Sequence, residues 1–542
     1  MARRRHGAGV WAKLRRMLDD GFLAPHAVAR WAAERPDALA VERIEGGVRT
    51  YAEMLASSQT WASAFAAQGV TAGAHVATML PNGFEALDAW LSLGWLRAVE
   101  VPLNTAYLGR MLHYALLTAD VTMLMVGAEF VERLEPLLDE LPLLRHVIVV
   151  GGPVPTWLAH AVPSACTLDE HLDGHVPREF DGPRYRDIEA IIYTSGTTGP
   201  SKGVLVPWAS AYQMFSWVPA DTLAPGESIY CAFQPFHIAG KSVYNSAFVR
   251  GARLVLRDKF SATNFLDDVR RFDCVAASVV GPMTALLHAQ PRRADDADNP
   301  LRSVLLGPMI PEMEDFEKRY GVRVATCYGM TEIGSPVATT FDHGPWQTCG
   351  RARTDYPWTE IRLVDEFDEE VPVGQTGEMI VRSEPWALNA GYYNMPDKTA
   401  EAWRNGWFHT GDAFRCDAEG NYYFVDRMKD SIRRRGENIS SFEVENAVLE
   451  HPDVVDVSAI GVAATHGEDE VMVIVVARDP ASFDPLALVE WLDERMPRFM
   501  VPRYIDLVDD LPRNETSMRV KKMELRQQGV TSRTWDREAT RP

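Results

Sequence analysis

The chain alternates short apolar runs with helix-like stretches along most of its length. Runs rich in β-branched residues suit buried strands, as in HVIVV (146–150), EAIIYT (189–194), RLVLR (253–257) and VMVIVV (471–476). Between such runs lie stretches with a helical spacing of apolar residues, as in ATNFLDDVRRF (262–272) and PEMEDFEKRY (311–320). Because a parallel strand connection needs a crossover helix, this alternation predicts an α/β fold with parallel sheet.

The length of the chain predicts more than one domain. At 542 residues it exceeds what one hydrophobic core usually supports. A boundary is expected where the strand-like EGNYYFVD gives way to the basic segment RMKDSIRRRGEN. We predict a large N-terminal domain of layered α/β subdomains, residues 1–425, and a small mobile α+β C-terminal domain, residues 426–542. The capping-box pair Ser440 and Glu443 should begin a helix near the start of the small domain.

Composition disfavours several classes of protein. The 55 basic against 75 acidic residues give a net charge of −20, which opposes indiscriminate binding to nucleic acid or anionic membrane. The apolar runs are too short for a membrane span, and the basic N-terminus lacks the apolar stretch of a secretory signal. The six cysteines lie singly and far apart, without zinc spacing or a dense disulfide framework. We therefore expect a soluble cytoplasmic protein; a homodimer is one open alternative.

The segment YTSGTTGPSKG (193–203) places glycines, hydroxyl side chains and one lysine directly after a strand-like run. Backbone N–H groups of a glycine-rich turn form a concave anion site, which favours a phosphate cradle over a flexible surface turn. The segment does not fit the G-x-x-x-x-G-K-[ST] pattern, because Ser201 precedes the lysine and Gly203 follows it, so a P-loop kinase or NTPase is disfavoured. The predicted phosphate-binding residues are Thr194, Ser195, Gly196, Thr197, Thr198, Gly199 and Lys202.

Five segments, in order, carry a family resemblance over nearly the whole chain. They are YTSGTTGPSKG, QPFHIAG (234–240), CYGMTEIG (327–334), GWFHTGD (406–412) and VDRMKDSIRRRGENISSFEVE (425–445). Together they resemble the signatures of the adenylate-forming enzymes, which include acyl-CoA synthetases, luciferases and peptide-synthetase adenylation domains. VPLNTAYLGRMLHYAL and KFSATNFLDDVRRF look most like the carnitine/crotonobetaine-CoA ligase and medium-to-long acyl-CoA synthetase branch.

The resemblance implies roles for residues of CYGMTEIG. Tyr328, followed by Gly329, would stack on the adenine base, and Thr331 would donate to a phosphate. Glu332 would take an oxygen position on magnesium, with the hydroxyl of Thr194 as a second expected ligand. Without the other segments, a buried strand-to-turn segment would be the preferred interpretation.

The resemblance also implies roles at the start of the predicted small domain. Asp412 would accept hydrogen bonds from both ribose hydroxyls, and Arg427 would be the second ribose-side residue. Lys429 would be the hinge about which the small domain swings between adenylation and thiolation. Gly436 would let the pantetheine arm of CoA approach closely. Taken alone, these residues are typical of turns and solvated surfaces.

The closing segment LPRNETSMRVKK (511–522) departs from the family pattern LPRTPTGKIQK, whose lysine contacts the α-phosphate and ribose. Counting forward from the proline places Met518 at the lysine position, whereas counting backward from KKMELR places Arg519 there. We prefer Arg519 because the chemistry needs a cation. The planar guanidinium of arginine can bind a phosphate, but it is not the compact point charge that the ammonium of lysine provides. If Met518 occupies the site, the enzyme would depend on Lys521 or adenylate poorly.

These features predict an ATP-dependent acid–CoA ligase. ATP with Mg²⁺ would activate a carboxylic acid as acyl-AMP, and the thiol of CoA would then displace AMP. The resemblance implies that His237 borders the entry of the acyl carboxylate, although a lone histidine beside apolar residues is also typical of a core. Apolar positions next to the motifs suggest an aliphatic or cyclic acyl group: Val279, Val280, Met309, Met330 and Ile333. The alternatives are an adenylation enzyme that loads a carrier protein in trans and a nucleotide- or acyl-binding homologue with weak turnover.

Overall fold

The computed structural model describes residues 19–194, 201–307, 309–310, 312–341, 344–354, 359–384, 386–428, 430, 432–434, 437–463, 469–513 and 519–539. Contacts divide the chain into two compact units. The first comprises the described residues of Met1–Ser195, Ser201–Glu360 and Arg382–Gly406, and the second those of Ile361–Val381 and Trp407–Pro542. The predicted domain boundary at residues 425/426, and the mobility of the small domain, stay predictions.

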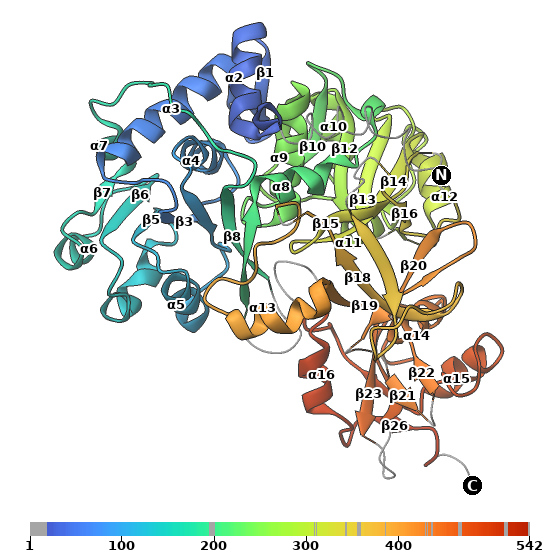
Figure 1. Cartoon of the computed structure of the whole chain (residues 1–542). Coiled ribbons are helices and arrows are strands. Elements are labelled where there is room, and N and C mark those ends of the chain that lie inside the picture. Colours follow the sequence, from blue (N-terminus) through green and yellow to red (C-terminus); the bar gives the residue numbers. More distant parts are fainter. Residues whose placement is uncertain are drawn as a thin grey trace, which may run out of the picture. The chain divides into compact units, whose positions relative to one another are not determined.

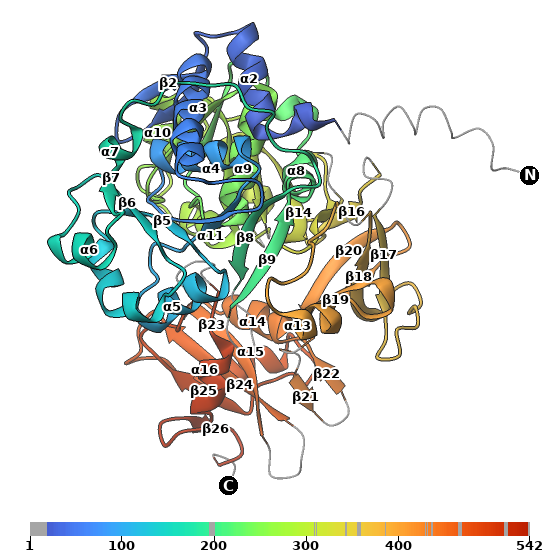
Figure 2. The ribbon, with the colours of Figure 1, turned by 60° about the vertical axis from the view of Figure 1, so that its left-hand side comes forward.

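A mostly parallel sheet forms one part of the first unit. Its strands lie in the order β7-β6-β5-β3-β4-β8-β9, and every neighbouring pair is parallel except the antiparallel pair β8 and β9. Figure 1 shows β3, β5 and β6 side by side with α4 and α5 on opposite sides of them, and Figure 2 shows β8 beside β9. The strands are β3 (His75–Met79), β4 (Val99–Pro102), β5 (Met123–Gly127), β6 (His146–Val150), β7 (Cys166–Thr167), β8 (Ile188–Thr194) and β9 (Lys202–Pro207). The helices are α3 (Tyr51–Ala67), α4 (Phe84–Trp95), α5 (Gly109–Thr118), α6 (Thr156–Ala161) and α7 (Leu168–Leu172).

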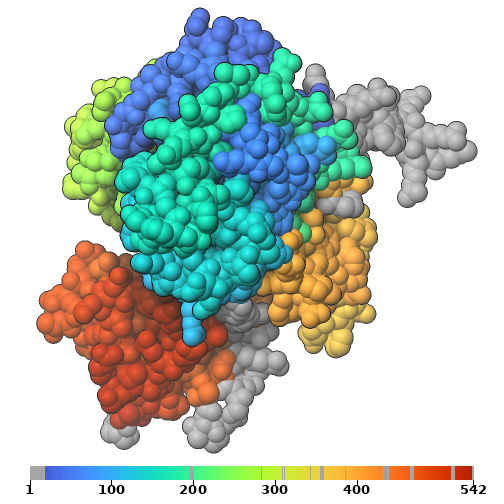
Figure 3. All heavy atoms as spheres, turned by 90° about the vertical axis from the view of Figure 1, so that its left-hand side faces the viewer, coloured from blue at the N-terminus to red at the C-terminus, as the bar shows by residue number. Residues whose placement is uncertain are grey.

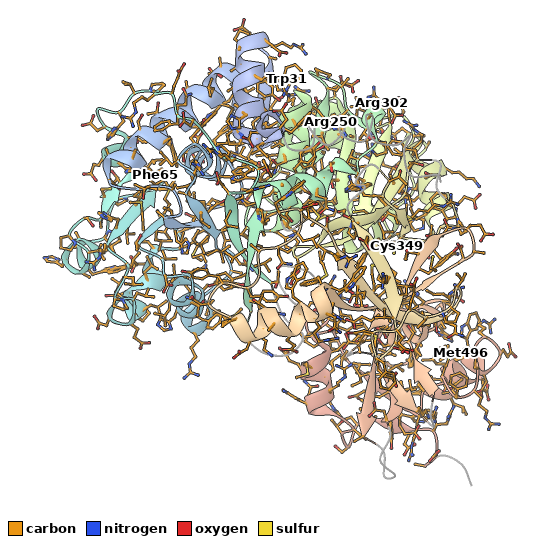
Figure 4. The ribbon with its side chains drawn as sticks, in the orientation of Figure 1. Trp31, Phe65, Arg250, Arg302, Cys349 and Met496 are labelled. Atoms are coloured by element: carbon orange, nitrogen blue, oxygen red, sulfur yellow. The ribbon has the colours of Figure 1, made fainter. Side chains whose placement is uncertain are left out.

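Helices pack against this sheet through buried apolar side chains. Figure 3 shows the described residues in cyan, which include β5, β6 and α5, on the near side of the first unit, next to residues in blue. Phe65 of α3, labelled in Figure 4, is fully buried, and its ring lies 4.9 Å from that of His171 on α7. Thr50 caps α3 through a reciprocal capping box with Glu53, which satisfies two backbone N–H groups at the helix start.

A second sheet of the first unit has the order β16-β15-β14-β13-β12-β10-β11-β1-β2. Its central pairs are parallel, and β1/β2, β14/β15 and β15/β16 are antiparallel. The strands are β1 (Leu39–Arg43), β2 (Val48–Thr50), β10 (Ser228–Cys231), β11 (Arg253–Leu256), β12 (Cys274–Val280), β13 (Ser303–Gly307), β14 (Arg323–Met330), β15 (Gly334–Ala338) and β16 (Gly350–Ala352). The helices are α2 (Ala24–Glu34), α8 (Trp208–Ser216), α9 (Ile238–Arg250), α10 (Phe265–Arg271), α11 (Gly281–His288), α12 (Met313–Tyr320) and α13 (Pro396–Ala402). The 3-10 helices are η1 (Asp20–Phe22), η2 (Val131–Glu140), η3 (Ala220–Thr222) and η4 (Arg404–Gly406).

An ionic cluster is buried where α4, α9, β4 and β8 meet. Lys241 forms an ion pair with Glu100, and its Nζ lies 3.9 Å from Oε1 of Glu189. Trp90 Nε1 donates to the same Glu189 oxygen at 2.7 Å, and Lys241 and both glutamates are no more than 2% exposed. Burial raises the pKa of Glu189 to about 7. Loss of the lysine would leave the two buried glutamates without a cation, which would destabilise the unit.

The second unit contains three groups of mainly antiparallel strands. One has the order β17-β18-β19-β20, the second is the antiparallel pair β21 and β22, and the third has the order β23-β24-β25-β26, with β24 and β25 parallel. Ser440 caps α14, because its hydroxyl accepts a hydrogen bond from Glu443 N at 3.1 Å, as the sequence predicted. The strands are β17 (Glu360–Val364), β18 (Thr376–Arg382), β19 (Phe408–Cys416), β20 (Asn421–Arg427), β21 (Ile432–Arg434), β22 (Glu437–Ile439), β23 (Val454–Ala463), β24 (Asp469–Ala477), β25 (Tyr504–Leu507) and β26 (Trp535–Asp536). The helices are α14 (Ser441–Leu449), α15 (Pro485–Asp493) and α16 (Lys522–Gln528).

The described residues contain no helix with the length and apolar character needed to cross a membrane.

Candidate active site

The predicted phosphate loop connects β8 to β9. Thr194, the last residue of β8, faces Lys202 across the antiparallel pair, and its hydroxyl donates to the Lys202 carbonyl at 3.4 Å. Gly203 packs tightly, since a Cβ there would lie 2.8 Å from Cγ2 of Ile191. The strand pair therefore fixes the lysine at the end of the loop. The other predicted loop residues, Ser195, Gly196, Thr197, Thr198 and Gly199, lie outside the described residues, and their roles stay predictions.

A tight turn between β14 and β15 positions the second group of predicted residues. Gly334 begins β15 with a φ of +65°, in the left-handed region that favours glycine. A Cβ on Gly329 would lie 2.4 Å from the Gly334 carbonyl oxygen, so only glycine allows this close approach. The turn buries Thr331 and Glu332, which are 7% and 4% exposed. The two glycines thus let the chain present a carboxylate in the interior.

A segment that the sequence analysis did not single out, residues 389–393, contacts both groups. Asn389 donates from its backbone N and its side-chain Nδ2 to the Glu332 carbonyl oxygen, at 2.9 and 2.7 Å. The segment also pairs with the backbone of β9 through Ala390 N to Leu205 O (2.9 Å), Leu205 N to Gly391 O (3.0 Å) and Tyr393 N to Gly203 O (2.8 Å). The 389–393 segment therefore holds the β14–β15 turn beside the strand that begins with Lys202.

Tyr392 of this segment contacts both charged side chains. Its hydroxyl donates to Oε1 of Glu332 at 3.0 Å and accepts a hydrogen bond from Nζ of Lys202 at 3.3 Å. The same Nζ lies 4.3 Å from the centroid of the tyrosine ring, within range of a cation–π interaction. Burial, with the Glu332 carboxylate as the next cause, raises the pKa of Tyr392 well above its usual value. The structure thus brings the predicted lysine and the predicted carboxylate to one protonated phenol.

His237 and Tyr328 have structural partners in the described chain. Nδ1 of His237 accepts a hydrogen bond from Ala239 N at 3.0 Å, so the histidine caps the start of α9. Tyr328 is half-buried on β14, and its hydroxyl donates to Sδ of Met330 at 3.9 Å. Their predicted contacts with the acyl carboxylate and the adenine base stay predictions.

Asp412 and Arg427 face each other across β19 and β20 in the second unit. They are register partners, and Nε of Arg427 lies 2.9 Å from Oδ1 of Asp412. Asp412 is 3% exposed, and its backbone N donates to the Thr410 hydroxyl at 3.1 Å. Gly411 precedes it with a φ of +69° and donates its N–H to Glu378 Oε1 at 2.9 Å. The two predicted ribose residues therefore lie together, although they are 15 positions apart in sequence.

The closing segment of the chain is described only in part. Arg519 is exposed beside Val520, which forms an isolated antiparallel bridge with Arg513. Lys522 lies on α16, and its Nζ forms an ion pair with Oε1 of Glu445 at 2.8 Å. Its charge is therefore paired within the second unit. Met518 and the predicted hinge and tunnel residues, Lys429 and Gly436, lie outside the described residues.

Comparison with known proteins agrees with this arrangement. The family model described as AMP-binding enzyme matches residues 28–393, and that of the AMP-binding enzyme C-terminal domain matches residues 443–517. The chain belongs to the AMP-binding enzyme family. A crotonobetaine/carnitine–CoA ligase of Citrobacter koseri is 31% identical over 503 residues, covering 90% of this chain and 95% of the relative.

Solved structures share the fold of this AMP-binding enzyme. The anthranilate CoA ligase AuaEII in complex with anthranoyl-AMP has a TM-score of 0.81 at 21% identity, covering 93% of this chain and 97% of that one. ATP-bound MatB from Rhodopseudomonas palustris has a TM-score of 0.80 at 25% identity, covering 93% and 99%. The predicted family, the α/β fold class and the prediction of an enzyme are thereby confirmed.

No sequence motif of this AMP-binding enzyme pointed to Asn389 and Tyr392. They lie in LNAGYYNMP, which has neither a helical nor a strand-like spacing of apolar residues. The segment has one local pattern, a glycine followed by two aromatic residues and then a proline. This pattern predicts a turn, but it does not indicate which residues the turn contacts. The long-range contacts with Glu332 and Lys202 give the segment its significance.

Proposed function

We propose that this AMP-binding enzyme is an ATP-dependent acid–CoA ligase that forms acyl-AMP and pyrophosphate and then transfers the acyl group to CoA. The supporting observation is the meeting of Lys202 and Glu332 at the hydroxyl of Tyr392 within one compact unit. An ammonium and a carboxylate held this close suit a polyphosphate and its magnesium ion. The CoA ligase names of the relatives support the same reaction class.

The proposed chemistry requires charge neutralisation more than a protein nucleophile. A carboxylate oxygen of the acid attacks the α-phosphorus of ATP, and the bond to the β-phosphate oxygen breaks to release pyrophosphate. Both reactants are anions, so cations and hydrogen-bond donors must offset their repulsion and align them. Lys202 and Thr331 are the proposed donors to the phosphates, and Arg519 is the proposed second cation.

The second step forms the thioester. The thiol of CoA attacks the acyl carbon of acyl-AMP, the bond to the phosphate oxygen breaks, and AMP leaves with the electron pair. The thiol proton passes to solvent or to the departing phosphate. His237 is proposed beside the acyl carboxylate, and Lys429 and Gly436 are proposed as hinge and pantetheine-side residues.

A magnesium ion fits the buried carboxylate of Glu332. The described residues hold no group of three or more His, Cys, Asp or Glu side chains suited to a metal ion. Mg²⁺ at nucleotides is commonly held by one or two carboxylates, substrate phosphates and water, so a single inward-facing glutamate suits it. Glu332 is the proposed ligand, and Thr194 the second; bound Mg²⁺ would offset phosphate charge.

Asp412 and Arg427 are proposed to bind the ribose of the nucleotide. A carboxylate accepts hydrogen bonds from two neighbouring hydroxyls, and the guanidinium 2.9 Å away keeps it in place by a charge-assisted contact. Tyr328 and Gly329 are proposed beside the adenine. A cytoplasmic location is proposed because all six cysteines are free thiols, and a homodimer remains one proposed assembly.

The acyl group is proposed to be aliphatic or cyclic. Val280, Met309 and Met330 are half-buried, so they are the candidates to contact an apolar acyl group. Val279 and Ile333 are 2% and 0% exposed and belong to the buried core, so they support this proposal less. A panel of acids is therefore needed to identify the substrate.

One assay tests the proposed function. The full-length protein is incubated with ATP, Mg²⁺ and a panel of carboxylic acids, with and without CoA, while pyrophosphate, AMP and acyl-CoA are followed. Acid-dependent pyrophosphate and CoA-dependent thioester are expected. Release of ADP would refute adenylation, and AMP with pyrophosphate but no thioester would favour a carrier-protein acceptor. ATP binding without any product would favour the weak-turnover homologue.

A further inference from the structure

Residues 389–393 form the structural link between the two charged groups of the candidate site. Asn389 fixes the backbone of the turn that contains Glu332, with hydrogen bonds of 2.7 and 2.9 Å to its carbonyl oxygen. Gly391 has a φ of +105°, and Tyr392 N donates to the Thr399 hydroxyl at 2.9 Å, which fixes the direction of the tyrosine side chain. Tyr392 is 5% exposed, so its ring has little freedom to move.

The proton positions at Tyr392 follow from the chemistry of its partners. An ionised carboxylate only accepts hydrogen bonds and an ammonium only donates them, whereas a phenol does both. Tyr392 must therefore donate to Glu332 and accept from Lys202, at 3.0 and 3.3 Å. A phenol is protonated at neutral pH, so Tyr392 has the one proton that this arrangement requires.

We propose that Tyr392 is a positioning residue that sets the separation of the Lys202 ammonium and the Glu332 carboxylate for binding of Mg²⁺ and ATP. This inference rests on the proposed function. The phenol oxygen lies between opposite charges, which would otherwise attract each other into a direct ion pair and offer less charge to the ligand. One oxygen of Glu332 is oriented by the phenol, as ligands of metal ions are commonly oriented by a second hydrogen bond.

The test compares two tyrosines of the same segment. Tyr392→Phe removes the hydroxyl and keeps the ring, whereas Tyr393→Phe removes a hydroxyl that donates to Asp120 Oδ2 at 2.9 Å. Binding of ATP to the full-length protein is measured by calorimetry over a series of Mg²⁺ concentrations, without acid or CoA. Tyr392→Phe is expected to raise the half-saturating Mg²⁺ concentration roughly tenfold or more. Tyr393→Phe is expected to match the Mg²⁺ dependence of wild type, and melting curves without ligand measure any loss of stability separately.

A double-mutant cycle shows whether Tyr392 acts through Glu332. In a Glu332→Gln background, Tyr392→Phe is expected to change the Mg²⁺ dependence by less than about twofold, since the coupled partner is already altered. An undiminished effect in that background would overturn the inference, and so would wild-type Mg²⁺ dependence in Tyr392→Phe.

Measurements on the wild-type protein distinguish a failure of the proposed function from a failure of the role proposed for Tyr392. Wild type that binds no ATP and releases no pyrophosphate with any acid would overturn both the proposed function and this inference. Wild type that does both, with Tyr392→Phe indistinguishable from it, would overturn the inference alone.

Discussion

Burial of His171 makes the first unit sensitive to acid. The imidazole on α7 is 3% exposed, its ring lies 4.9 Å from that of Phe65, and neither ring nitrogen has a hydrogen-bond partner among the described residues. Burial, followed by repulsion from His175 and His146, lowers the pKa of His171 from 6.5 to about 4. The unfolded chain therefore binds this proton before the folded one does, and the shift corresponds to about 3 kcal/mol.

The direction and size of the effect follow from that difference. Above pH 6.5 the ring is neutral in both states and its contribution is complete; as the pH falls from 6.5 to 4, the free energy of unfolding should decrease by about 3 kcal/mol. His171→Leu keeps an apolar side chain of similar size and removes the titrating group. Urea unfolding of wild type and variant, measured at pH values from 4.5 to 8, gives the difference between their free energies of unfolding. That difference should grow in favour of the variant as the pH falls.

An exposed histidine provides the control for this prediction. His160 lies exposed on α6, and its Nδ1 hydrogen-bonds the Thr156 carbonyl within the same turn at 2.7 Å. His160→Leu should change the free energy of unfolding by only a small amount, because the side chain lies exposed at the surface. Parallel pH curves for wild type and His171→Leu would refute the reasoning from burial.

Three further predictions concern the candidate site and the core. Asp412→Asn should weaken ATP binding by roughly tenfold to a hundredfold in calorimetry, because a neutral amide replaces charge-assisted acceptors; unchanged affinity would contradict the ribose role. Arg519→Ala should lower acid-dependent pyrophosphate release on the order of a hundredfold, whereas Met518→Ala should change it little; the reverse result would reject the alignment that places Arg519 in the site. Lys241→Met should lower the free energy of unfolding by roughly 3–5 kcal/mol in urea, because it leaves buried carboxylates without their cation. Adding Glu100→Gln should recover part of that loss, and no recovery would contradict the ion-pair explanation.

Local patterns predicted the elements of the fold well. HVIVV is the strand β6, and Ser440 caps α14 as expected, because apolar runs and caps depend on neighbouring residues. The nearness of Asp412 and Arg427 followed from family spacing, and the structure gives its cause in the antiparallel register of β19 and β20. Contacts between distant segments could not be predicted in this way, because no local pattern specifies which tyrosine meets which carboxylate.

The histidine and tyrosine of the candidate site show why motif position alone does not assign a role. His237 lies in a recognisable motif, yet its Nδ1 caps a helix, which is a structural role that any similar N-cap acceptor could fill. Tyr392 lies outside the signatures used for the sequence analysis, yet its hydroxyl connects the loop lysine with the buried glutamate. A motif identifies residues that a family shares, whereas two hydrogen bonds that join a lysine and a glutamate to the same hydroxyl identify residues whose energies are coupled. Removing the hydroxyl of Tyr392 should therefore affect ligand binding, and its effect should disappear with the carboxylate it orients.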